Sequence, residues 1–298
     1  MKRNKHVEWK PSATFPADVK GKQIAIIGGT GGIGRALSKH LASLGAQVIV
    51  VGQTFRDMGR PGIEFIKADL SLMTEAQRVA MELPAEQLDM VIFTTGIFAA
   101  PKRQTTAEGI ERDLAVSYLN RLVILRGIAS RLGTGRPRGR VKPRIFLMGY
   151  PGTGQIGSSE DMNAEQSYKA MSAHMNTVAG NEMLVLDGAA RYPKIDFFGL
   201  NPGLIKTGIR DNFFGKDSLK SRIMETLIGW LTPTAEAYAE RITPLLLAPA
   251  LESCSSTMFN NKGLAILPSA GLTKAHIRAF MSASEALLGR TDVQIPTH

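Results

Sequence analysis

The chain of 298 residues has a single cysteine, few aromatic residues and no long apolar run. One cysteine, Cys254, excludes an internal disulfide and a cysteine-based metal cluster. No uninterrupted apolar stretch approaches the ~20 residues that a membrane-spanning helix needs. The basic start, Met1 to His6, is not followed by the apolar core of a secretion signal. We therefore expect a cytoplasmic protein with no membrane span and no metal site.

Acidic residues are outnumbered by basic ones, with 26 Asp and Glu against 36 Lys and Arg and a net charge of +10. The basic residues form two local clusters, at residues 2–10 and between Arg131 and Arg144. The second cluster is spaced by Gly and Pro and lacks helical periodicity and interleaved aromatics, which is typical of a solvated loop. We expect no nucleic-acid partner, because attraction of a phosphorylated small molecule is a sufficient use for part of this charge.

Apolar runs alternate with helical patterns along most of the chain, which predicts an α/β fold with a doubly wound parallel sheet. A Rossmann-type domain at residues 21–298 would follow an extended arm at 1–20, and residues 208–232 would form a helical lid over a substrate. The expected strands lie near 23–28, 47–51, 63–67, 89–94, 144–148, 195–200 and 264–267. The expected helices lie near 33–44, 73–83, 106–132, 164–191, 217–231, 233–249 and 273–288.

Five glycines lie between Gly28 and Gly34, directly after the apolar run Ile24 to Ile27 and before a helical pattern. A buried strand that enters a glycine turn and then a helix lets the backbone approach a dinucleotide pyrophosphate. The helix start also offers unpaired N–H groups and the positive end of its dipole. The glycines fit two registers, GxGxxG and GxxxGxG, and either match alone is a weak signal.

Landmarks after later strands choose between the two registers. Ala68-Asp69-Leu70, Thr94-Thr95-Gly96 and Asn201 to Thr207 each follow an expected strand. Together with Gly28-x-x-x-Gly32-x-Gly34 they resemble the short-chain dehydrogenase/reductase superfamily over residues 22–270. The resemblance implies a nicotinamide cofactor, with Asp69 at the adenine and the Pro202-Gly203 loop at the nicotinamide. The expected cofactor-binding residues are Gly28, Thr30, Gly31, Gly32, Ile33, Gly34, Gln53, Thr54, Arg56, Asp69, Leu70, Thr95, Gly96, Pro202, Gly203, Ile205 and Thr207.

The residues at the end of the second strand determine the preference for NAD or NADP, because a carboxylate there would bind the ribose hydroxyls of NAD. The run Val50 to Arg56 contains no carboxylate, and the first one is Asp57. Arg56 is placed to pair with a 2′-phosphate, and Arg35 is a second candidate cation. The sequence therefore predicts NADP over NAD.

The family's catalytic pattern is only partly present. The resemblance implies a tyrosine general acid on the fifth helix, a lysine one turn later, a serine after the fifth strand and an asparagine in the fourth helix. Tyr168 takes the tyrosine position, but the lysine is its neighbour Lys169, and Ser117 stands at the asparagine position. The serine position falls on Gly149 or Tyr150, and the possible substitutes are Thr153, Ser158 and Ser159. His174 and His276 are interpreted as structural residues.

The leading hypothesis is an NADP(H)-dependent oxidoreductase that transfers hydride between nicotinamide and a carbonyl or alcohol of a moderately apolar small molecule. Tyr168 would supply or accept the proton, and Lys169 and Ser117 are the further catalytic candidates. Because Lys169 would lie about 100° around the helix from Tyr168, it could reach the nicotinamide ribose only if the start of the helix is irregular. The alternative is an inactive NAD(P)-binding sensor or scaffold on the same fold. A homodimer or homotetramer that pairs through the fourth and fifth helices is a further expectation from the resemblance.

Overall fold

One eight-stranded sheet forms the centre of the molecule in a computed structural model that describes residues 1–137, 141–205, 233–294 and 296. The strand order is β3-β2-β1-β4-β5-β6-β7-β8, and only the β7–β8 pair is antiparallel. The strands are β1 (Gln23–Ile27), β2 (Gln47–Gly52), β3 (Ile63–Lys67), β4 (Met90–Phe93), β5 (Arg144–Met148), β6 (Asp196–Leu200), β7 (Thr257–Phe259) and β8 (Ala265–Ile266). The predicted α/β fold with a mostly parallel sheet is thus confirmed.

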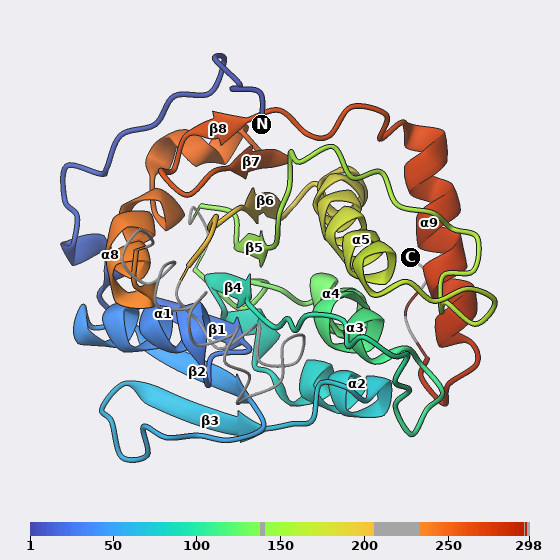
Figure 1. The fold of residues 1–298 in the computed structure, drawn as a ribbon. Coiled ribbons are helices and arrows are strands. Elements are labelled where there is room, and N and C mark those ends of the chain that lie inside the picture. The colour runs from blue at the N-terminus through green and yellow to red at the C-terminus, as the bar shows by residue number, and fades with distance from the viewer. Residues whose placement is uncertain (138–140, 206–232, 295, 297–298) are drawn as a thin grey trace.

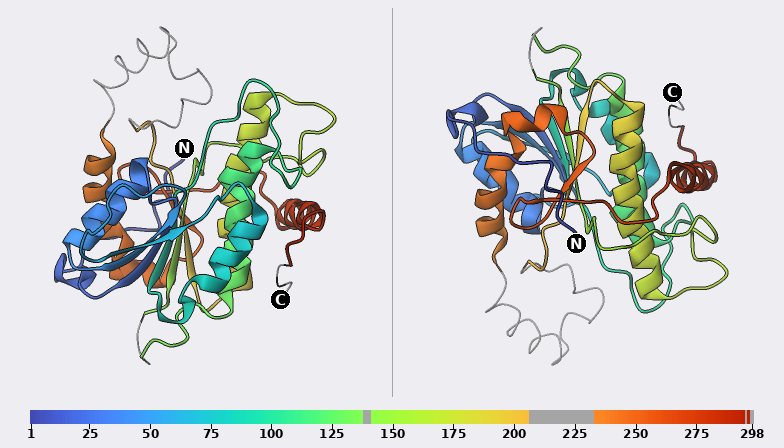
Figure 2. Two further views of the ribbon diagram at one scale, coloured as in Figure 1. Left: turned by 90° about the horizontal axis from the view of Figure 1, so that it is seen from below. Right: turned by 90° about the horizontal axis from the view of Figure 1, so that it is seen from above.

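Helices cover both faces of this sheet (Figure 1, Figure 2). Helices α1 and α8 lie on one face, and α2, α4 and α5 lie on the other, with α9 outside α5. The α-helices are α1 (Gly32–Ser43), α2 (Met73–Glu82), α3 (Arg112–Leu114), α4 (Asn120–Ala129), α5 (Ala170–Arg191), α8 (Ala235–Leu246) and α9 (Lys274–Leu288). Shorter helical segments are η1 (Ala17–Val19), η2 (Ala85–Gln87), the π-helical η3 (Ala115–Leu119) and η5 (Pro249–Ser253).

The strand residues divide between two apolar cores because successive side chains of a strand point to opposite faces. In β1, Ile24 and Ile26 belong to the core under α1 and α8. Ala25 and Ile27 belong to the core under α2, α4 and α5. Burial on both faces explains why the central strands are continuously apolar and do not alternate.

Two helices begin later than the sequence predicts. The helix expected at 106–132 begins only at Arg112, and its first turns include the π-helical η3. The helix expected at 164–191 begins at Ala170, because the preceding segment forms a separate turn. In that turn the Asp161 carboxylate accepts the backbone N–H groups of residues 165–167. Strand β7 was not predicted, and the expected helix at 217–231 lies outside the described residues.

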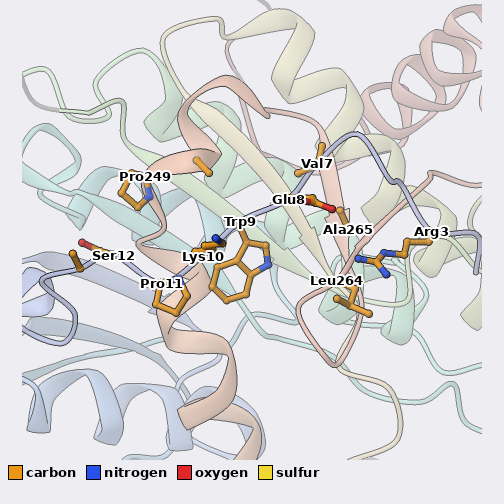
Figure 3. Close-up of a pocket in the computed structure, with 12 residues that line it drawn as sticks. Arg3, Val7, Glu8, Trp9, Lys10, Pro11, Ser12, Pro249, Leu264 and Ala265 are labelled. Atoms are coloured by element: carbon orange, nitrogen blue, oxygen red, sulfur yellow. The ribbon is translucent and has the colours of Figure 1, made fainter.

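The two ends of the chain pack on the outside of this framework. The N-terminal segment runs along β8, where Asn4 N–H donates to Ala265 O at 2.9 Å. A surface cavity of about 550 Å³ lies between this segment, with Trp9 at its centre, and Pro249 and Leu264 (Figure 3). At the other end, Phe280 of α9 packs edge-on against Tyr118 of η3. Helix α9 therefore covers part of the face through which pairing was expected.

Candidate active site

A cavity of about 600 Å³ opens at the carboxyl ends of the strands. It lies where the strand order reverses between β1 and β4, which is the ligand-binding position of open parallel sheets. Its lining comes from the segments that follow β1, β2, β4, β5 and β6, and from η3, α4 and α5. The lining residues are Gly28, Thr30, Gly31, Gly32, Ile33, Arg56, Thr94, Thr95, Gly96, Ile97, Phe98, Val116, Ser117, Arg121, Met148, Gly149, Tyr150, His174, Thr177, Val178, Asn181, Pro202, Gly203 and Ile205.

The glycine turn after β1 is shaped by close backbone contacts. Gly28 has a φ of +92°, and a Cβ built there would lie 2.6 Å from the Thr95 backbone nitrogen. At Gly31 a Cβ would meet no atom within 4 Å, so its open side faces the cavity that it lines. Helix α1 begins at Gly32 without a side-chain cap on its N–H groups. This cradle fits the pyrophosphate of a dinucleotide, which needs close backbone approach and free N–H donors.

Most of the predicted cofactor residues line this one cavity. They are Gly28, Thr30, Gly31, Gly32, Ile33, Arg56, Thr95, Gly96, Pro202, Gly203 and Ile205. Five others, Gly34, Gln53, Thr54, Asp69 and Leu70, are not among its lining residues. The prediction at Thr207 and the predicted lid at 208–232 lie outside the described residues.

Gly34 and Asp69 contribute to the shape of the site. A Cβ at Gly34 would lie 2.5 Å from Gly28 O, so the glycine lets α1 pack against the turn. Asp69 accepts the Ser71 N–H at 3.0 Å and the Ser71 hydroxyl at 2.7 Å. Although burial favours the neutral acid, these hydrogen bonds hold the pKa of Asp69 below its usual value. Asp69 is therefore an ionised residue that fixes the turn after β3.

The two candidate cations near β2 differ in their partners. Arg35 makes two hydrogen bonds of 2.7 Å to the Asp57 carboxylate, which lower the pKa of Asp57. Arg56 lines the cavity and has no carboxylate within 4.0 Å among the described residues. Of the two arginines, Arg56 is therefore the one whose charge is available to a phosphate.

Tyr168 and Lys169 do not lie on α5, so the expectation that Tyr168 is a helix residue is wrong. Tyr168 donates its hydroxyl to Ala100 O at 2.6 Å and is not among the lining residues of the cavity. Burial, together with the charges of Glu111 and Asp113, raises the pKa of Tyr168 to about 12. That shift is opposite to the one a phenolic general acid needs. Lys169 precedes the first turn of α5 and is exposed.

Ser117 belongs to a buried polar chain that sequence reasoning did not find. Its hydroxyl accepts the Ile97 N–H at 3.0 Å and donates to Asp113 Oδ1 at 2.5 Å. The other Asp113 oxygen lies 2.8 Å from His174 Nδ1. The Phe98 ring stacks on the His174 ring at 4.3 Å between centroids. Ser117, Phe98 and His174 all line the cavity, whereas Asp113 is fully buried behind them.

No local pattern joins these residues, since Asp113 and His174 are 61 residues apart. The only sequence signal for Asp113 is a carboxylate inside an otherwise apolar helical stripe. A single histidine in a helix is more often structural, and the interpretation of His174 followed that rule.

A buried cation, Arg121, joins three elements under the same cavity. Its guanidinium donates to Thr95 O, to Met148 O at 2.6 Å and to Asn181 Oδ1 at 2.9 Å. Burial lowers the pKa of Arg121 to about 9, so it remains positively charged at neutral pH. Asn181 in turn donates to Ser117 O at 2.8 Å. The ends of β4 and β5 are therefore fixed to α4 and α5.

The expected serine position after β5 contains no serine in the cavity. Gly149 and Tyr150 are lining residues, and Tyr150 donates its hydroxyl to Gly203 O at 2.6 Å. The substitutes Thr153, Ser158 and Ser159 are not lining residues. Thr153 and Ser158 direct their hydroxyls to backbone oxygens, those of Tyr150 and Glu160. None of the three is placed to replace the missing serine.

Within the described residues, no group of three His, Cys, Asp or Glu side chains is arranged to hold a metal ion. The same part of the chain has no helix that is both long and apolar enough to cross a membrane.

Comparison with known proteins places this geometry in a family. Residues 22–141 match the short chain dehydrogenase family model. An uncharacterized oxidoreductase of Saccharomyces cerevisiae is 51% identical over 291 residues, which cover 96% of this chain and 94% of the yeast protein. The chain therefore belongs to the short-chain dehydrogenase/reductase family and is an oxidoreductase of that type.

More distant relatives and solved structures agree with this assignment. Retinol dehydrogenase 14 of Mus musculus is 25% identical over 301 residues, covering 92% of this chain and 88% of the mouse protein. A putative short chain dehydrogenase from Pseudomonas syringae superposes with a TM-score of 0.60 at 18% identity, covering 85% of this chain and all of that structure. Aldohexose dehydrogenase of Thermoplasma acidophilum gives the same TM-score at 17% identity, covering 82% of this chain and 93% of that structure. At these identities the structures support the fold alone.

Proposed function

We propose that the protein is an NADP(H)-dependent oxidoreductase that interconverts a carbonyl and an alcohol on a moderately apolar small molecule in the cytoplasm. The observation that carries the proposal is the single cavity that contains both the glycine turn and the Pro202-Gly203 loop. A nicotinamide cofactor bound there would supply or accept a hydride. The glycine turn and the start of α1 would hold its phosphates.

Arg56 supports NADP as the cofactor. Arg56 lines the cavity and lies in the loop that follows β2, the strand whose end holds the ribose of the adenosine half in this type of fold. A 2′-phosphate there would form charge-assisted hydrogen bonds with an arginine that has no carboxylate partner in the described part of the chain. The ribose hydroxyls of NAD would gain no comparable interaction.

The substrate class is inferred from the apolar part of the cavity wall. Phe98, Val116, Met148 and Val178 contribute apolar surface next to the polar group at His174. Two relatives carry names that fit such a pocket, retinol dehydrogenase 14 and a putative daunorubicin C-13 ketoreductase that is 23% identical. A carbonyl on an apolar skeleton matches this combination of surfaces.

A non-catalytic NAD(P)-binding protein is the second candidate. The exposure of Lys169 and the position of Tyr168 outside the cavity lining favour it. Arg121 argues against a non-catalytic protein. Its guanidinium supplies a positive charge at the cavity, where the expected Lys169 is not a lining residue. We also propose a homodimer or homotetramer that pairs through the fourth and fifth helices, and such pairing would use the part of that face that α9 leaves uncovered.

The direct test is a fluorescence titration of the purified protein with NADPH and, in parallel, with NADH. We expect tight binding of NADPH and binding of NADH that is at least ~10-fold weaker, as loss of one charge-assisted contact implies. Equal affinities would contradict the NADP assignment. Binding of neither would contradict the function as proposed.

A further inference from the structure

The cavity contains a histidine in the arrangement that proton-transferring residues use. His174 lies on α5 with Nδ1 2.8 Å from the fully buried carboxylate of Asp113. A carboxylate at one ring nitrogen fixes the tautomer and ring orientation and directs the other nitrogen to its own partner. Among the described residues, Nε2 of His174 has no hydrogen-bond partner, and the ring lines the cavity.

The groups around the histidine hold it in this orientation. Ser117 donates to the second oxygen of Asp113, so both carboxylate oxygens are engaged. The Phe98 ring lies against one side of the imidazole, with an interplanar angle of 26°. A residue that had only to fill space would not need a buried carboxylate, because burying that charge carries a large desolvation cost.

The two tyrosines nearby are less suited to the same task. Tyr168 is outside the cavity lining, donates to Ala100 O and has a raised pKa. Tyr150 lines the cavity, but its hydroxyl donates to Gly203 O. Both phenols therefore have their proton directed to a backbone oxygen.

We propose that His174 is the proton donor and acceptor of this site, an inference that rests on the proposed oxidoreductase function. In the reducing direction, a dihydronicotinamide supplies the hydride that forms the new C–H bond at the carbonyl carbon and is itself oxidised. The electron pair of the carbonyl π bond moves to oxygen, which takes a proton from Nε2 of the His174 imidazolium. The imidazole becomes neutral and regains a proton from solvent. In the oxidising direction Nε2 accepts the alcohol proton.

The first test needs no substrate. Long-range ¹H–¹⁵N NMR correlation resolves the five histidines of the chain, and the spectrum of His174→Gln assigns His174. We expect addition of NADP to shift the Nε2 signal of His174 and to leave that of His6 in place. If backbone signals of the glycine turn shift while the His174 signal does not, the inference is overturned although the cofactor binds. If no signal shifts, the proposed function fails.

The second test compares variants of the full chain. His174→Gln keeps a donor for Asp113 but has no titratable proton, so we expect unchanged NADPH affinity and carbonyl reduction about 10²- to 10⁴-fold slower. His174→Ala should regain part of its rate with added imidazole, which a purely structural role would not allow. The matched control His6→Ala changes an exposed histidine and should behave as wild type. Two results would overturn the proposal. One is turnover of His174→Gln within threefold of wild type, and the other is a 10²- to 10⁴-fold loss of turnover in Tyr150→Phe or Tyr168→Phe but not in His174→Gln.

Discussion

The two halves of the site are built in different ways. The glycine turn and the start of α1 present backbone atoms to the cavity, and their positions follow from one short stretch of sequence. The half near β5 and α5 relies on side chains from separate elements, among them Asp113, Ser117 and His174. A backbone cradle depends on local conformation, whereas a side-chain cluster depends on the tertiary fold. The first half is therefore determined by local sequence and the second by tertiary packing.

The largest effect on the backbone half is expected from a substitution at Gly28. In Gly28→Ala, a positive φ and overlap with the Thr95 backbone should together lower the free energy of unfolding by about 2–4 kcal/mol. We expect a loss of measurable NADPH binding as well. Thermal unfolding and a fluorescence titration would measure the two effects.

Gly31→Ala is the matched comparison, because its Cβ would meet no protein atom within 4 Å. We expect unchanged thermal stability together with weaker NADPH binding. Strong binding in both variants would show that the turn does not hold the phosphates.

Asp113 tests the side-chain half. Asp113→Asn keeps the shape of the side chain but removes the charge that pairs with His174. We expect turnover to fall about 10²-fold, since proton transfer is typically worth 10²–10⁴-fold, with NADPH affinity unchanged. Steady-state kinetics and the titration separate the two quantities. A variant with wild-type turnover would remove Asp113 from the account.

Arg56 tests whether the backbone half also contains a specificity element. In Arg56→Ala we expect NADPH affinity to fall about tenfold, and NADH affinity to stay the same, because only the former has a 2′-phosphate. Arg60→Ala is the control, since Arg60 is exposed in the same loop and does not line the cavity. Equal losses for the two cofactors would place Arg56 at a different part of the dinucleotide.

The smallest effect is expected at Asp57. Its pairing with Arg35 lies at the surface and is partly buried, with 36% of the Arg35 side chain and 11% of the Asp57 side chain exposed. We therefore expect it to contribute only about 0.2–1 kcal/mol. Because the pKa of Asp57 is lowered in the folded state, this contribution is present above the unfolded carboxyl pKa of about 4 and is lost as pH falls through the folded value. Urea unfolding of wild type and Asp57→Asn should differ at pH 7 and converge in acid. In the variant, Arg35 loses its carboxylate partner, so NADPH should bind more tightly if Arg35 can reach the 2′-phosphate. Weaker binding would argue against a role for Arg35 beside the phosphate.

The sequence allowed prediction of the sheet and of the glycine turn because both have local signatures. Continuous apolar runs mark the strands, and Gly28, Gly32 and Gly34 mark the turn. The start of α5 could not be predicted in the same way. Tyr168 and Lys169 continue a helical pattern, but the turn closed by the Asp161 carboxylate delays the helix to Ala170. This kind of competition between side-chain and helical hydrogen bonds depends on the tertiary surroundings.

The His174 cluster lay beyond sequence reasoning for a different reason. Asp113 and His174 come from separate helical segments, and only the packing of α3 against α5 brings them together. The family pattern indicates Tyr168 and not His174. Helix α9 was predicted as a helix, but its place over Tyr118 was not, because nothing local indicates which face a terminal helix covers.

We propose that a glycine-turn cofactor cradle works here with a proton-transferring residue, His174, that differs from the tyrosine of the family pattern. The most direct measurement is single-turnover mixing of the NADPH-loaded protein with a panel of apolar aldehydes and ketones, following the near-ultraviolet absorbance of the dihydronicotinamide. The account predicts oxidation of the bound cofactor by at least one compound, and a much slower reaction in His174→Gln. Tight NADPH binding with no oxidation across the panel would contradict the account and favour a cofactor-binding protein without turnover.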